Sequence, residues 1–343
     1  MQKLFVTGGA GFIGSAFTRL ALSELPGCRV TNFDALTYAG NPDNLKDLDE
    51  SRHRFIHGDI SEEDAVHAAL ADEVPDAIIN FAAETHVDRS ITSAQEFLRT
   101  NILGTQVLLD AARAHGVSRF VHISTDEVMG SLPEDDETAF FTEASPLDPK
   151  NPYAATKAAA EHLVNAAHHT FRLDTVITRC GNNYGPRQFP EKLIPLLIAN
   201  ALQDEMIPVY GDGRNVRDWI YVEDHCRAVL LALSKGASGA IYNIGARNER
   251  RNIEVVTSIL DALSKPHSLI RFVTDRPGHD RRYAIDPAKA ERELNWQPRE
   301  TWESGIRKTI QWYQQNDDWI RRAQSGAYRE YYARHYGTEV GQR

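Results

Sequence analysis

The first half of the chain alternates short apolar runs with amphipathic stretches. The apolar runs lie at residues 4–7, 30–33, 55–57, 77–81, 120–124 and 175–178. Between them, apolar positions recur at helical spacing, as at Phe12, Ile13, Phe17, Leu20 and Ala21. This alternation predicts βαβ units and a doubly wound parallel sheet with helices on both faces. An all-helical chain with short buried segments is the less favoured alternative.

The second half of the chain has a less regular pattern. Proline and glycine become frequent beyond residue 180, for example in Gly185-Pro186 and Gly211-Asp212-Gly213. We expect a smaller mixed α/β domain over residues 181–343, with some segments returning to the first domain. The acidic run at residues 134–137 predicts a solvated loop. A packing or interface helix is expected for the tail after Gln315, whose aromatic residues are Trp319, Tyr328, Tyr331, Tyr332 and Tyr336.

Composition narrows the class of protein. The chain has 343 residues, of which 42% are hydrophobic and 25% charged, as is typical of a globular protein. A net charge of −10 argues against an electrostatic nucleic-acid binder. The three cysteines show neither metal-ligand spacing nor a disulfide framework. The first apolar run begins at residue 4 and no run approaches membrane-spanning length, so we expect a cytoplasmic protein with no signal peptide and no membrane contact.

A glycine motif follows the first predicted strand. In TGGAGFIG, at residues 7–14, Gly8, Gly11 and Gly14 allow a tight turn and close approach of a pyrophosphate to a helix N-terminus. Asp34 ends the second strand, where a carboxylate accepts hydrogen bonds from a ribose and repels a 2′-phosphate. Together these features predict a Rossmann-type domain over residues 1–180 that binds NAD in preference to NADP. Strand ends at Asp59-Ile60 and Phe81-Ala82-Ala83 should add to the same site.

Tyr153 and Lys157 lie four residues apart on a helix that Asn151-Pro152 begins, so they share one face. A lysine ammonium beside the phenol, with an oxidised nicotinamide nearby, stabilises the phenolate and lowers the pKa of the tyrosine. Tyr153 could then remove a proton from an alcohol whose carbon gives hydride to NAD. With the glycine motif, this pair resembles the extended branch of the short-chain dehydrogenase/reductase superfamily.

Ser124-Thr125-Asp126-Glu127 follows another predicted strand and places two carboxylates beside the cofactor. Loss of water from a sugar needs an acid for the departing hydroxyl and a base for the neighbouring C–H. Two close buried carboxylates can divide these roles by taking different pKa values. On local sequence alone, a solvated Asp-Glu turn is equally compatible.

Several longer segments resemble the dTDP-glucose 4,6-dehydratases. The resemblance runs from residue 3 to about residue 315 and includes FAAETHVDRS (81–90), RCGNNYGP (179–186), PEKLIP (190–195) and RPGHDRRY (276–283). Two positions depart from the usual family pattern: Met129 stands where the family has tyrosine, and Gly181 where it often has serine. We expect Met129 to reshape a wall of the pocket.

The resemblance implies a complete reaction. Thr125 positions the sugar 4-hydroxyl, Tyr153 removes its proton, Glu127 takes the C5 proton and Asp126 protonates the departing C6 hydroxyl, while bound NAD is regenerated. It also implies a homodimer formed through helices near residues 95–114 and 153–171. Cofactor contacts are expected at Gly8, Gly11, Phe12, Ile13, Gly14, Asp34, Ala35, Leu36, Thr37, Asp59, Ile60, Phe81, Ala82, Ala83, Thr100, Ser124, Tyr153, Lys157 and Asn183.

The nucleotide-sugar site needs cations although the chain is acidic. Arg217 and Arg276 are the best candidates because a planar guanidinium suits phosphate oxygens. The substrate residues expected with them are Thr85, Thr125, Asn182, Lys192, Leu193, Pro208, Tyr210, Asn252 and His279. Taken singly, Asn252 resembles a helix N-cap, and His86 is at least as well explained as a structural histidine.

Other functions fit parts of this pattern. A UDP-sugar 4-epimerase or a UDP-glucuronate decarboxylase would need no dehydration acid–base pair, so Asp126 and Glu127 argue against both. A 4,6-dehydratase of a UDP-sugar stays open, because a single methyl contact with thymine is not visible in a motif. An NAD-sensing binding protein would not need Tyr153 and Lys157, and this chain has both residues together with the two acids.

Overall fold

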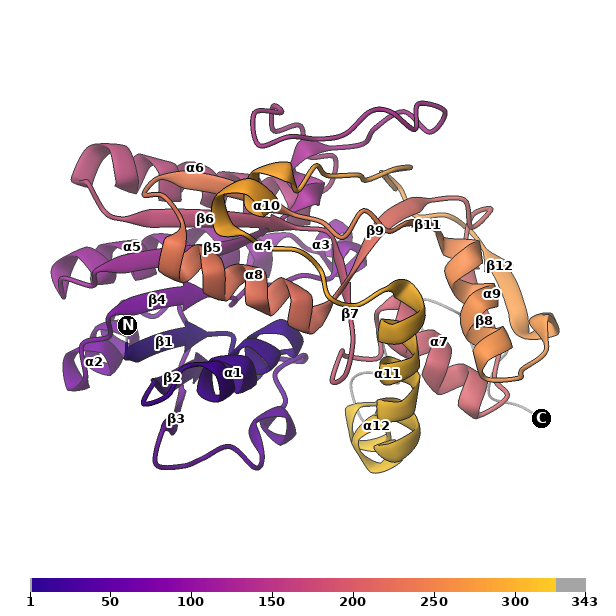
Figure 1. The fold of residues 1–343 in the computed structure, drawn as a ribbon, viewed down its shortest axis with the longest axis horizontal. Helices are drawn as coiled ribbons and strands as arrows, with labels where there is room; N and C mark the ends of the chain where they lie inside the picture. Colours follow the sequence, from indigo (N-terminus) through magenta and orange to yellow (C-terminus); the bar gives the residue numbers. More distant parts are fainter. Residues whose placement is uncertain (1, 325–343) are drawn as a thin grey trace.

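The computed structural model describes residues 2–324, and its largest element is a seven-stranded parallel sheet (Figure 1). The strand order is β10-β6-β5-β4-β1-β2-β3, which is doubly wound around β1. These strands are β1 (Lys3–Thr7), β2 (Arg29–Asp34), β3 (His53–His57), β4 (Ala77–Asn80), β5 (Arg119–Thr125), β6 (Thr175–Cys180) and β10 (Ala240–Ile244). The prediction of a Rossmann-type parallel sheet is confirmed, and the predicted apolar runs form β1 to β6.

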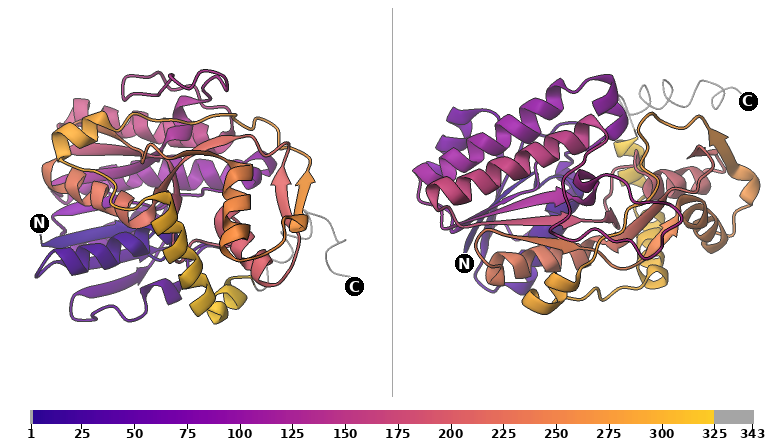
Figure 2. Two further views of the ribbon diagram at one scale, coloured as in Figure 1. Left: turned by 45° about the vertical axis from the view of Figure 1, so that its right-hand side comes forward. Right: turned by 90° about the horizontal axis from the view of Figure 1, so that it is seen from above.

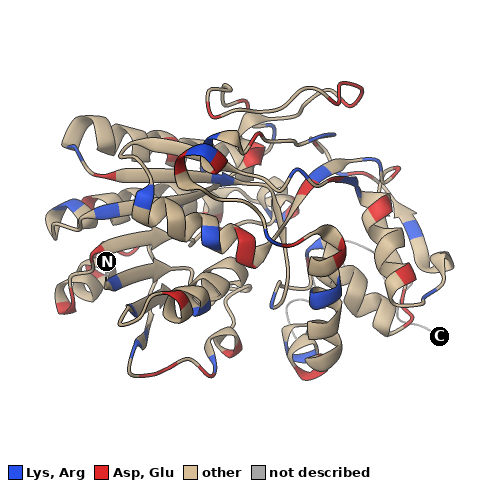
Figure 3. Cartoon of the chain, in the orientation of Figure 1, with Lys and Arg blue, Asp and Glu red and all other residues tan. Residues whose placement is uncertain are grey.

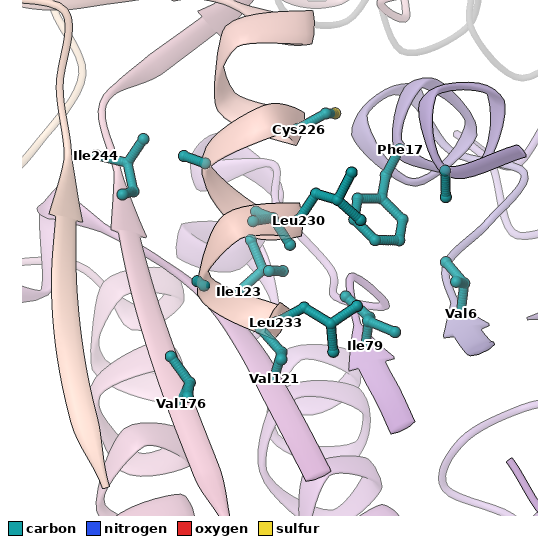
Figure 4. Close-up of a cluster of buried hydrophobic side chains, with 14 of the residues drawn as sticks. Val6, Phe17, Ile79, Val121, Ile123, Val176, Cys226, Leu230, Leu233 and Ile244 are labelled. Carbon is teal, nitrogen blue, oxygen red and sulfur yellow. The ribbon is translucent and has the colours of Figure 1, made fainter. Parts of the chain in front are cut away.

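Helices cover both faces of this sheet (Figure 2). On one face, side chains from alternate strand positions, such as Val6, Ile79 and Val121, pack with Phe17 and Leu230 from the covering helices (Figure 4). These helices are α1 (Phe12–Glu24), α8 (Val222–Lys235) and α10 (Ala288–Leu294). The other face packs on α2 (Glu63–Asp72), α5 (Thr105–Ala114) and α6 (Pro152–Phe171). Burial on both faces explains why the strands read as continuous apolar runs.

The second half of the chain builds a smaller mixed α/β unit with its own core. Its strands are β7 (Asn182–Tyr184), β8 (Ile207–Tyr210), β9 (Val216–Tyr221), β11 (Glu249–Arg251) and β12 (Ile270–Val273). Its helices are α7 (Leu193–Leu202), α9 (Asn252–Ala262), α11 (Trp302–Gln315) and α12 (Asp317–Ala323). The strands form a three-stranded sheet, β11-β9-β7, and a two-stranded sheet, β12-β8. Aromatic side chains such as Tyr184, Trp219 and Trp302 pack in the hydrophobic core of this unit.

Three elements of the second half, β10, α8 and α10, lie in the first unit. β10 pairs with β6 in the large sheet, and α8 packs against α1. This return produces the irregular pattern beyond residue 180, because strands of two different sheets alternate along the chain. The domain boundary at residue 180 stays a prediction. The shorter elements are α3 (Val87–Thr92), α4 (Gln95–Phe97), η1 (Pro42–Leu45), η2 (Leu98–Gly104), η3 (Asp126–Met129) and η4 (His267–Leu269).

Charged side chains of both signs are spread over the ribbon (Figure 3). The acidic run at residues 134–137 is exposed in a segment without helix or strand, as predicted. In the tail, α12 packs through buried Trp319, whereas Tyr328, Tyr331, Tyr332 and Tyr336 lie outside the described residues. Among residues 2–324, no helix is long and apolar enough to cross a membrane.

Candidate active site

A cavity of about 300 Å³ opens at the carboxyl ends of the large sheet. Its wall is formed by the turns after β1, β2, β3, β4, β5 and β6, by the start of α6 and by the segment before α7. In a doubly wound sheet this edge is where ligands bind. The cavity therefore lies where the sequence predicts both the dinucleotide and the reacting sugar.

Glycines shape the turn between β1 and α1. Gly8 has φ +67°, and a Cβ there would lie 2.7 Å from Ala82 N. A Cβ on Gly14 would lie 2.2 Å from Gly8 O, so any larger residue would force the helix away from the turn. Gly11 caps α1, whose first backbone amides have no side-chain partner at the cap. This leaves a helix N-terminus open to an anion.

Asp34 sits at the end of β2 with its carboxylate held by backbone amides. Oδ2 accepts from Ala10 N at 2.8 Å and Oδ1 from Leu36 N at 2.8 Å. Burial raises the pKa of Asp34, and these hydrogen bonds oppose the rise. Every residue expected at the cofactor lies in the cavity wall except Leu36. Leu36 has φ +51° and serves instead to turn its backbone amide toward Asp34.

Tyr153 and Lys157 project from the first turns of α6, which Asn151 caps by accepting from Ala154 N at 2.9 Å. Both side chains are buried, and Lys157 Nζ donates to Ile123 O at 2.6 Å. Burial lowers the pKa of Lys157 to about 8. The pKa of Tyr153 is raised well above its usual value, by burial and then by the nearby Glu127.

In the protein without its cofactor, Lys157 therefore does not lower the pKa of Tyr153 below its usual value, and the expected lowering by the lysine together with an oxidised nicotinamide stays a prediction. Lys157 donates a hydrogen bond to the backbone carbonyl of Ile123 near the end of β5. The carboxylates of Glu127 and Asp126 lie near the phenol of Tyr153 and raise its pKa. A hydrogen bond with Thr125 is the one lowering influence among the main causes. Further positive charge is needed before Tyr153 can act as a base near neutral pH.

Asp126 and Glu127 follow β5 directly, as predicted, but their surroundings differ. Asp126 is 1% exposed, and its pKa is raised well above its usual value by burial and by the adjacent Glu127. Burial also raises the pKa of Glu127, but Arg276, Arg217 and Lys192 oppose that rise. Glu127 is thus the carboxylate that ionises more readily. Asp126 Oδ2 and Ser124 Oγ are buried without a hydrogen-bond partner, and both residues line the cavity.

The residues expected at the substrate fall into two groups. Thr85, Thr125, Asn182 and Lys192 line the cavity, whereas Leu193, Pro208, Tyr210, Arg217, Asn252, Arg276 and His279 do not. Of the latter, Leu193 begins α7 and Pro208 lies in the middle of β8. Asn252 is the first residue of α9, whose cap position is Arg251, so its interpretation as the N-cap is wrong. Its side-chain oxygen is buried without a hydrogen-bond partner.

Four residues outside the cavity wall form a cation cluster that reaches Glu127. We use "cation cluster" for Tyr210, Arg217, Arg276 and His279. Arg217 Nη2 donates to Asp280 O at 2.9 Å, and its guanidinium lies 4.2 Å from the Tyr283 ring centroid. Arg276 Nη1 lies 3.5 Å from Asp88 Oδ1, and Asp88 Oδ2 accepts from Tyr210 OH at 3.1 Å.

His279 completes this cluster as a neutral group. Its Nδ1 lies 2.6 Å from Asp275 Oδ1, and burial followed by the two arginines lowers its pKa to about 4. The two guanidinium groups therefore carry the positive charge of the cluster. Two arginines with an uncharged imidazole beside them can bind an anionic diphosphate.

Two acids in the cavity wall had no role assigned from sequence. Glu84 follows β4 and Glu191 precedes α7. Glu191 Oε1 accepts from Tyr38 OH at 2.9 Å, and burial raises its pKa to about 7. Both residues lie inside the segments that resemble the family, which was the available signal. His86 caps α3 through its Nδ1 and lies 3.6 Å from Glu191, in agreement with a structural histidine.

The two departures from the family pattern have different surroundings. Met129 is 3% exposed and does not line the cavity; its sulfur accepts from Arg179 Nη1 at 3.6 Å. The expectation that it reshapes a pocket wall is therefore wrong. Gly181 does line the cavity, and a Cβ there would lie 2.7 Å from Asp218 O.

Comparisons with known proteins agree with this geometry. The family model described as GDP-mannose 4,6 dehydratase matches residues 5–309. A dTDP-glucose 4,6-dehydratase of Shigella flexneri is 48% identical over 98% of this chain and 99% of the relative. Another, of Xanthomonas campestris pv. campestris (strain B100), is 50% identical over 96% of this chain and 98% of the relative.

A solved structure extends the likeness to three dimensions. The dTDP-glucose 4,6-dehydratase DesIV from Streptomyces venezuelae, with NAD and TYD bound, superposes with a TM-score of 0.90 and 48% identity. The match covers 94% of this chain and 100% of DesIV. The chain therefore belongs to the GDP-mannose 4,6 dehydratase family and groups within it with the dTDP-glucose 4,6-dehydratases.

Proposed function

We propose that the protein is an NAD-dependent hydro-lyase that converts dTDP-glucose to dTDP-4-keto-6-deoxyglucose. The observation that carries the proposal is the pair of acids, Asp126 and Glu127, held beside Tyr153 and Lys157 in one cavity. A tyrosine and a lysine suffice for reversible oxidation of an alcohol, whereas elimination of water needs an acid and a base as well. Curated relatives at 48% and 50% identity support dTDP-glucose as the substrate.

NAD fits the cofactor end of the cavity. Gly8 and Gly14 leave space that a Cβ would fill, and the open N-terminus of α1 suits a pyrophosphate. Asp34 supplies carboxylate oxygens for a ribose and would repel a 2′-phosphate. DesIV and a Bacillus anthracis dTDP-glucose 4,6-dehydratase, both solved with NAD, support this choice. When bound, NAD supplies the hydride acceptor for C4 of the sugar and returns the hydride to C6.

Tyr153 removes the proton of the 4-hydroxyl in this proposal, and Thr125 orients that hydroxyl. The positive charge of Lys157 and of an oxidised nicotinamide ring favours the phenolate, which burial alone disfavours. The raised pKa of Tyr153 in the protein by itself thus keeps the phenol neutral until the ligands are in place. Oxidation at C4 then makes the C5 hydrogen acidic, because a ketone lies next to it.

Glu127 then acts as the base at C5 and Asp126 as the acid at C6. Their environments support this division, because burial and the adjacent carboxylate keep Asp126 protonated. Arg276 and Arg217 favour the ionised form of Glu127. Two adjacent carboxylates with opposite protonation states can transfer one proton each way during loss of water. The C6 hydroxyl leaves as water. Glu127 exchanges the proton taken from C5 with solvent and returns a proton to C5 when hydride returns to C6.

Arg217 and Arg276 are proposed to bind the diphosphate. Each is buried or half-buried, so its charge is little screened by water. Arg276 Nε is buried without a hydrogen-bond partner, which leaves it a donor for a phosphate oxygen. Because both arginines also act on Glu127, binding of the diphosphate and ionisation of the base are coupled.

The deciding experiment is mass spectrometry of the purified protein incubated with dTDP-glucose, or separately UDP-glucose, in heavy water without added NAD. Loss of one water with one deuterium gained at C5 is expected, together with a faster reaction of the thymidine nucleotide. Faster turnover of UDP-glucose would mean that the preferred substrate is the uridine nucleotide rather than the thymidine nucleotide. A product of unchanged mass but inverted C4 would indicate an epimerase, and no reaction of either substrate, even with added NAD, would reject the dehydratase.

We also propose a cytoplasmic homodimer. Apolar side chains of Ile91, Leu98, Leu103 and Phe171 are 40% to 51% exposed on or beside α3, η2 and α6. An exposed apolar surface of this kind is typical of a subunit interface. Three buried free cysteines fit a reducing compartment. Light scattering should give the mass of two chains, and Leu98→Glu with Leu103→Glu should give that of one.

A further inference from the structure

Glu161 and Arg179 form a buried ion pair one helical turn from Lys157. The proposed reaction gives this pair no role. The side chains of Glu161 on α6 and Arg179 on β6 are 0% and 3% exposed. Arg179 Nη2 lies 2.7 Å from Glu161 Oε2, and Arg179 Nε donates to the two carboxylate oxygens at 3.0 and 3.1 Å. Bulk water does not screen charges at this depth, so the pair acts on neighbouring groups more strongly than a surface pair would.

The backbone directs this pair toward Lys157. Glu161 follows Lys157 by four residues on α6, so the two side chains share one face of the helix. Arg179 pairs in register with Ser124, next to Ile123, whose carbonyl oxygen accepts from Lys157 Nζ at 2.6 Å. Glu161 raises the pKa of Lys157, against the larger lowering effect of burial.

Other titratable groups around Lys157 and Tyr153 come from the packed strands. They are His122 on β5, Cys180 on β6, and Asp126 and Glu127 after β5. Burial lowers the pKa of His122 and raises the pKa of Cys180 to about 12, so both are neutral at neutral pH. Glu143 meets Arg179 through its backbone carbonyl, 3.5 Å from Nη1, while its carboxylate accepts from Asn243 N.

A purely structural role would not require charged residues here. Replacing a buried ion pair by well-packed neutral side chains is often neutral or stabilising, because burial of two charges costs more than their attraction returns. Arg179 already contacts the sulfur of Met129, so an uncharged side chain of similar length could pack in its place. Packing alone therefore does not account for the two charges, and their place one helical turn from Lys157 points to an electrostatic role there.

We propose that Glu161 and Arg179 are positioning residues that balance each other's charge near Lys157, so that the pH at which Tyr153 becomes a base is held only while both charges are present or both are absent. The inference rests on the proposed function. Tyr153 and Lys157 titrate as a coupled pair, so a charge next to the lysine moves the apparent pKa of both. The Glu161–Arg179 pair presents almost no net charge, and removal of either partner unbalances it.

The two single substitutions should act in opposite directions. Arg179→Met leaves the Glu161 carboxylate uncompensated, which raises the apparent pKa of the Tyr153–Lys157 pair. The acidic limb of the pH–rate profile should then move to higher pH, by on the order of one unit. Glu161→Gln leaves the Arg179 cation, which favours loss of a proton, and should move that limb to lower pH by a similar amount.

The double variant Glu161→Gln/Arg179→Met separates this role from a structural one. It restores electrical balance without the ion pair, so its limb should return to within a few tenths of a unit of the parent. Arg179→Lys keeps the charge and should behave likewise. Since a buried unpaired charge destabilises the fold, melting temperature and bound cofactor are measured for every variant.

The readout is the pH dependence of cofactor reduction in a single turnover with dTDP-glucose, followed by the absorbance of the reduced cofactor. Opposite limb shifts in the singles and recovery in the folded double variant are the expected result. Limbs that coincide with the parent, or shift together in one direction, would overturn the inference. If a single variant does not fold, a double variant whose limb stays displaced would also overturn it. Absence of turnover by the parent protein would instead reject the proposed function.

Discussion

The cofactor end of the site and its nucleotide end are built from different parts of the chain. At the cofactor end, the wall comes from successive strand ends of one parallel sheet, and much of it is backbone and glycine. At the nucleotide end, the cation cluster gathers side chains from β8, β9 and the segment between β12 and α10. The first end is shaped by close packing, whereas the second is shaped by charge.

This difference decides how each end should respond to substitution. A glycine turn that admits no Cβ has little tolerance, because backbone on both sides would have to move. Charges held by hydrogen bonds to carbonyl groups can be removed one at a time, with graded effects. Asp126 and Glu127 lie where the two ends meet, so they should depend on both.

The largest effect is expected at this meeting point. Glu127→Gln or Asp126→Asn should lower the rate of dehydration by about 10²–10⁴-fold, because each removes a proton-transfer group. Oxidation at C4 should survive, since Tyr153 and Lys157 are unchanged. Stopped-flow absorbance should show reduced cofactor forming and persisting, while mass spectrometry shows no loss of water. Dehydration at the parent rate by both variants would contradict the assigned roles.

The next effect tests the cofactor end alone. Gly14→Ala places a Cβ 2.2 Å from Gly8 O, so the start of α1 must shift away from the pyrophosphate. We expect the variant to be purified with less than about a tenth of the NAD held by the parent, in line with loss of a charge-assisted contact. Gly11→Ala is the graded control, because its Cβ would lie 3.2 Å from the same oxygen. Equal cofactor content in Gly14→Ala and the parent would show that close packing does not define this end.

The third effect tests the nucleotide end. Arg276→Met should raise the KM for the nucleotide sugar about 10–100-fold, the value of one charge-assisted hydrogen bond, and leave bound NAD unchanged. Arg276 also favours ionised Glu127, so its loss should raise the pKa of that base. The acidic limb of the kcat profile then moves to higher pH, and activity recovers as pH rises.

The matched control is Arg214→Met, which removes an exposed arginine from the turn before β9. It should leave both KM and the pH profile as they are. A lowered cofactor content in Arg276→Met, or an unchanged KM, would mean that the two ends are not separable in the way their construction indicates.

The same contrast explains what could be predicted from sequence. The glycine turn, Asp34 and the strand ends are local patterns, and the structure brings them together in one cavity wall. Leu36 does not line that wall, and its left-handed backbone conformation has no local signal. The cation cluster has no local signal, because its members are separated by long stretches of chain, and only resemblance to a family named them. Neither source revealed that Asp88 joins Arg276 to Tyr210, since that contact is purely tertiary.

The pKa of Tyr153 marks another limit of sequence. The spacing to Lys157 correctly placed the two residues on one helix face but did not reveal that, without the cofactor, the pKa of the phenol is raised. Burial and the facing carboxylates decide that direction, and both arise only when β5 and α6 pack together. A return of some later segments to the first domain was predicted, but β10 itself was not identified, because the chain builds part of the smaller unit before it returns to the large sheet.

The smallest expected effect concerns a contact that joins the two halves. Trp319 on α12 is 5% exposed, and its Nε1 donates to Asn44 Oδ1 at 3.0 Å. Asn44 Nδ2 in turn donates to Ala10 O beside the glycine turn.

Trp319→Phe keeps most of the packing but removes this donor, which should cost about 1 kcal/mol of the free energy of unfolding. Because Asn44 also supports the turn, calorimetric titration should show NAD binding weakened by less than about tenfold, with the KM for the nucleotide sugar unchanged. Trp302→Phe is the control, since that indole packs on Tyr184 within the second core. It should lower stability without altering NAD affinity; equal effects of both variants on NAD binding would show that the cofactor end senses the stability of the second half as a whole rather than this one hydrogen bond.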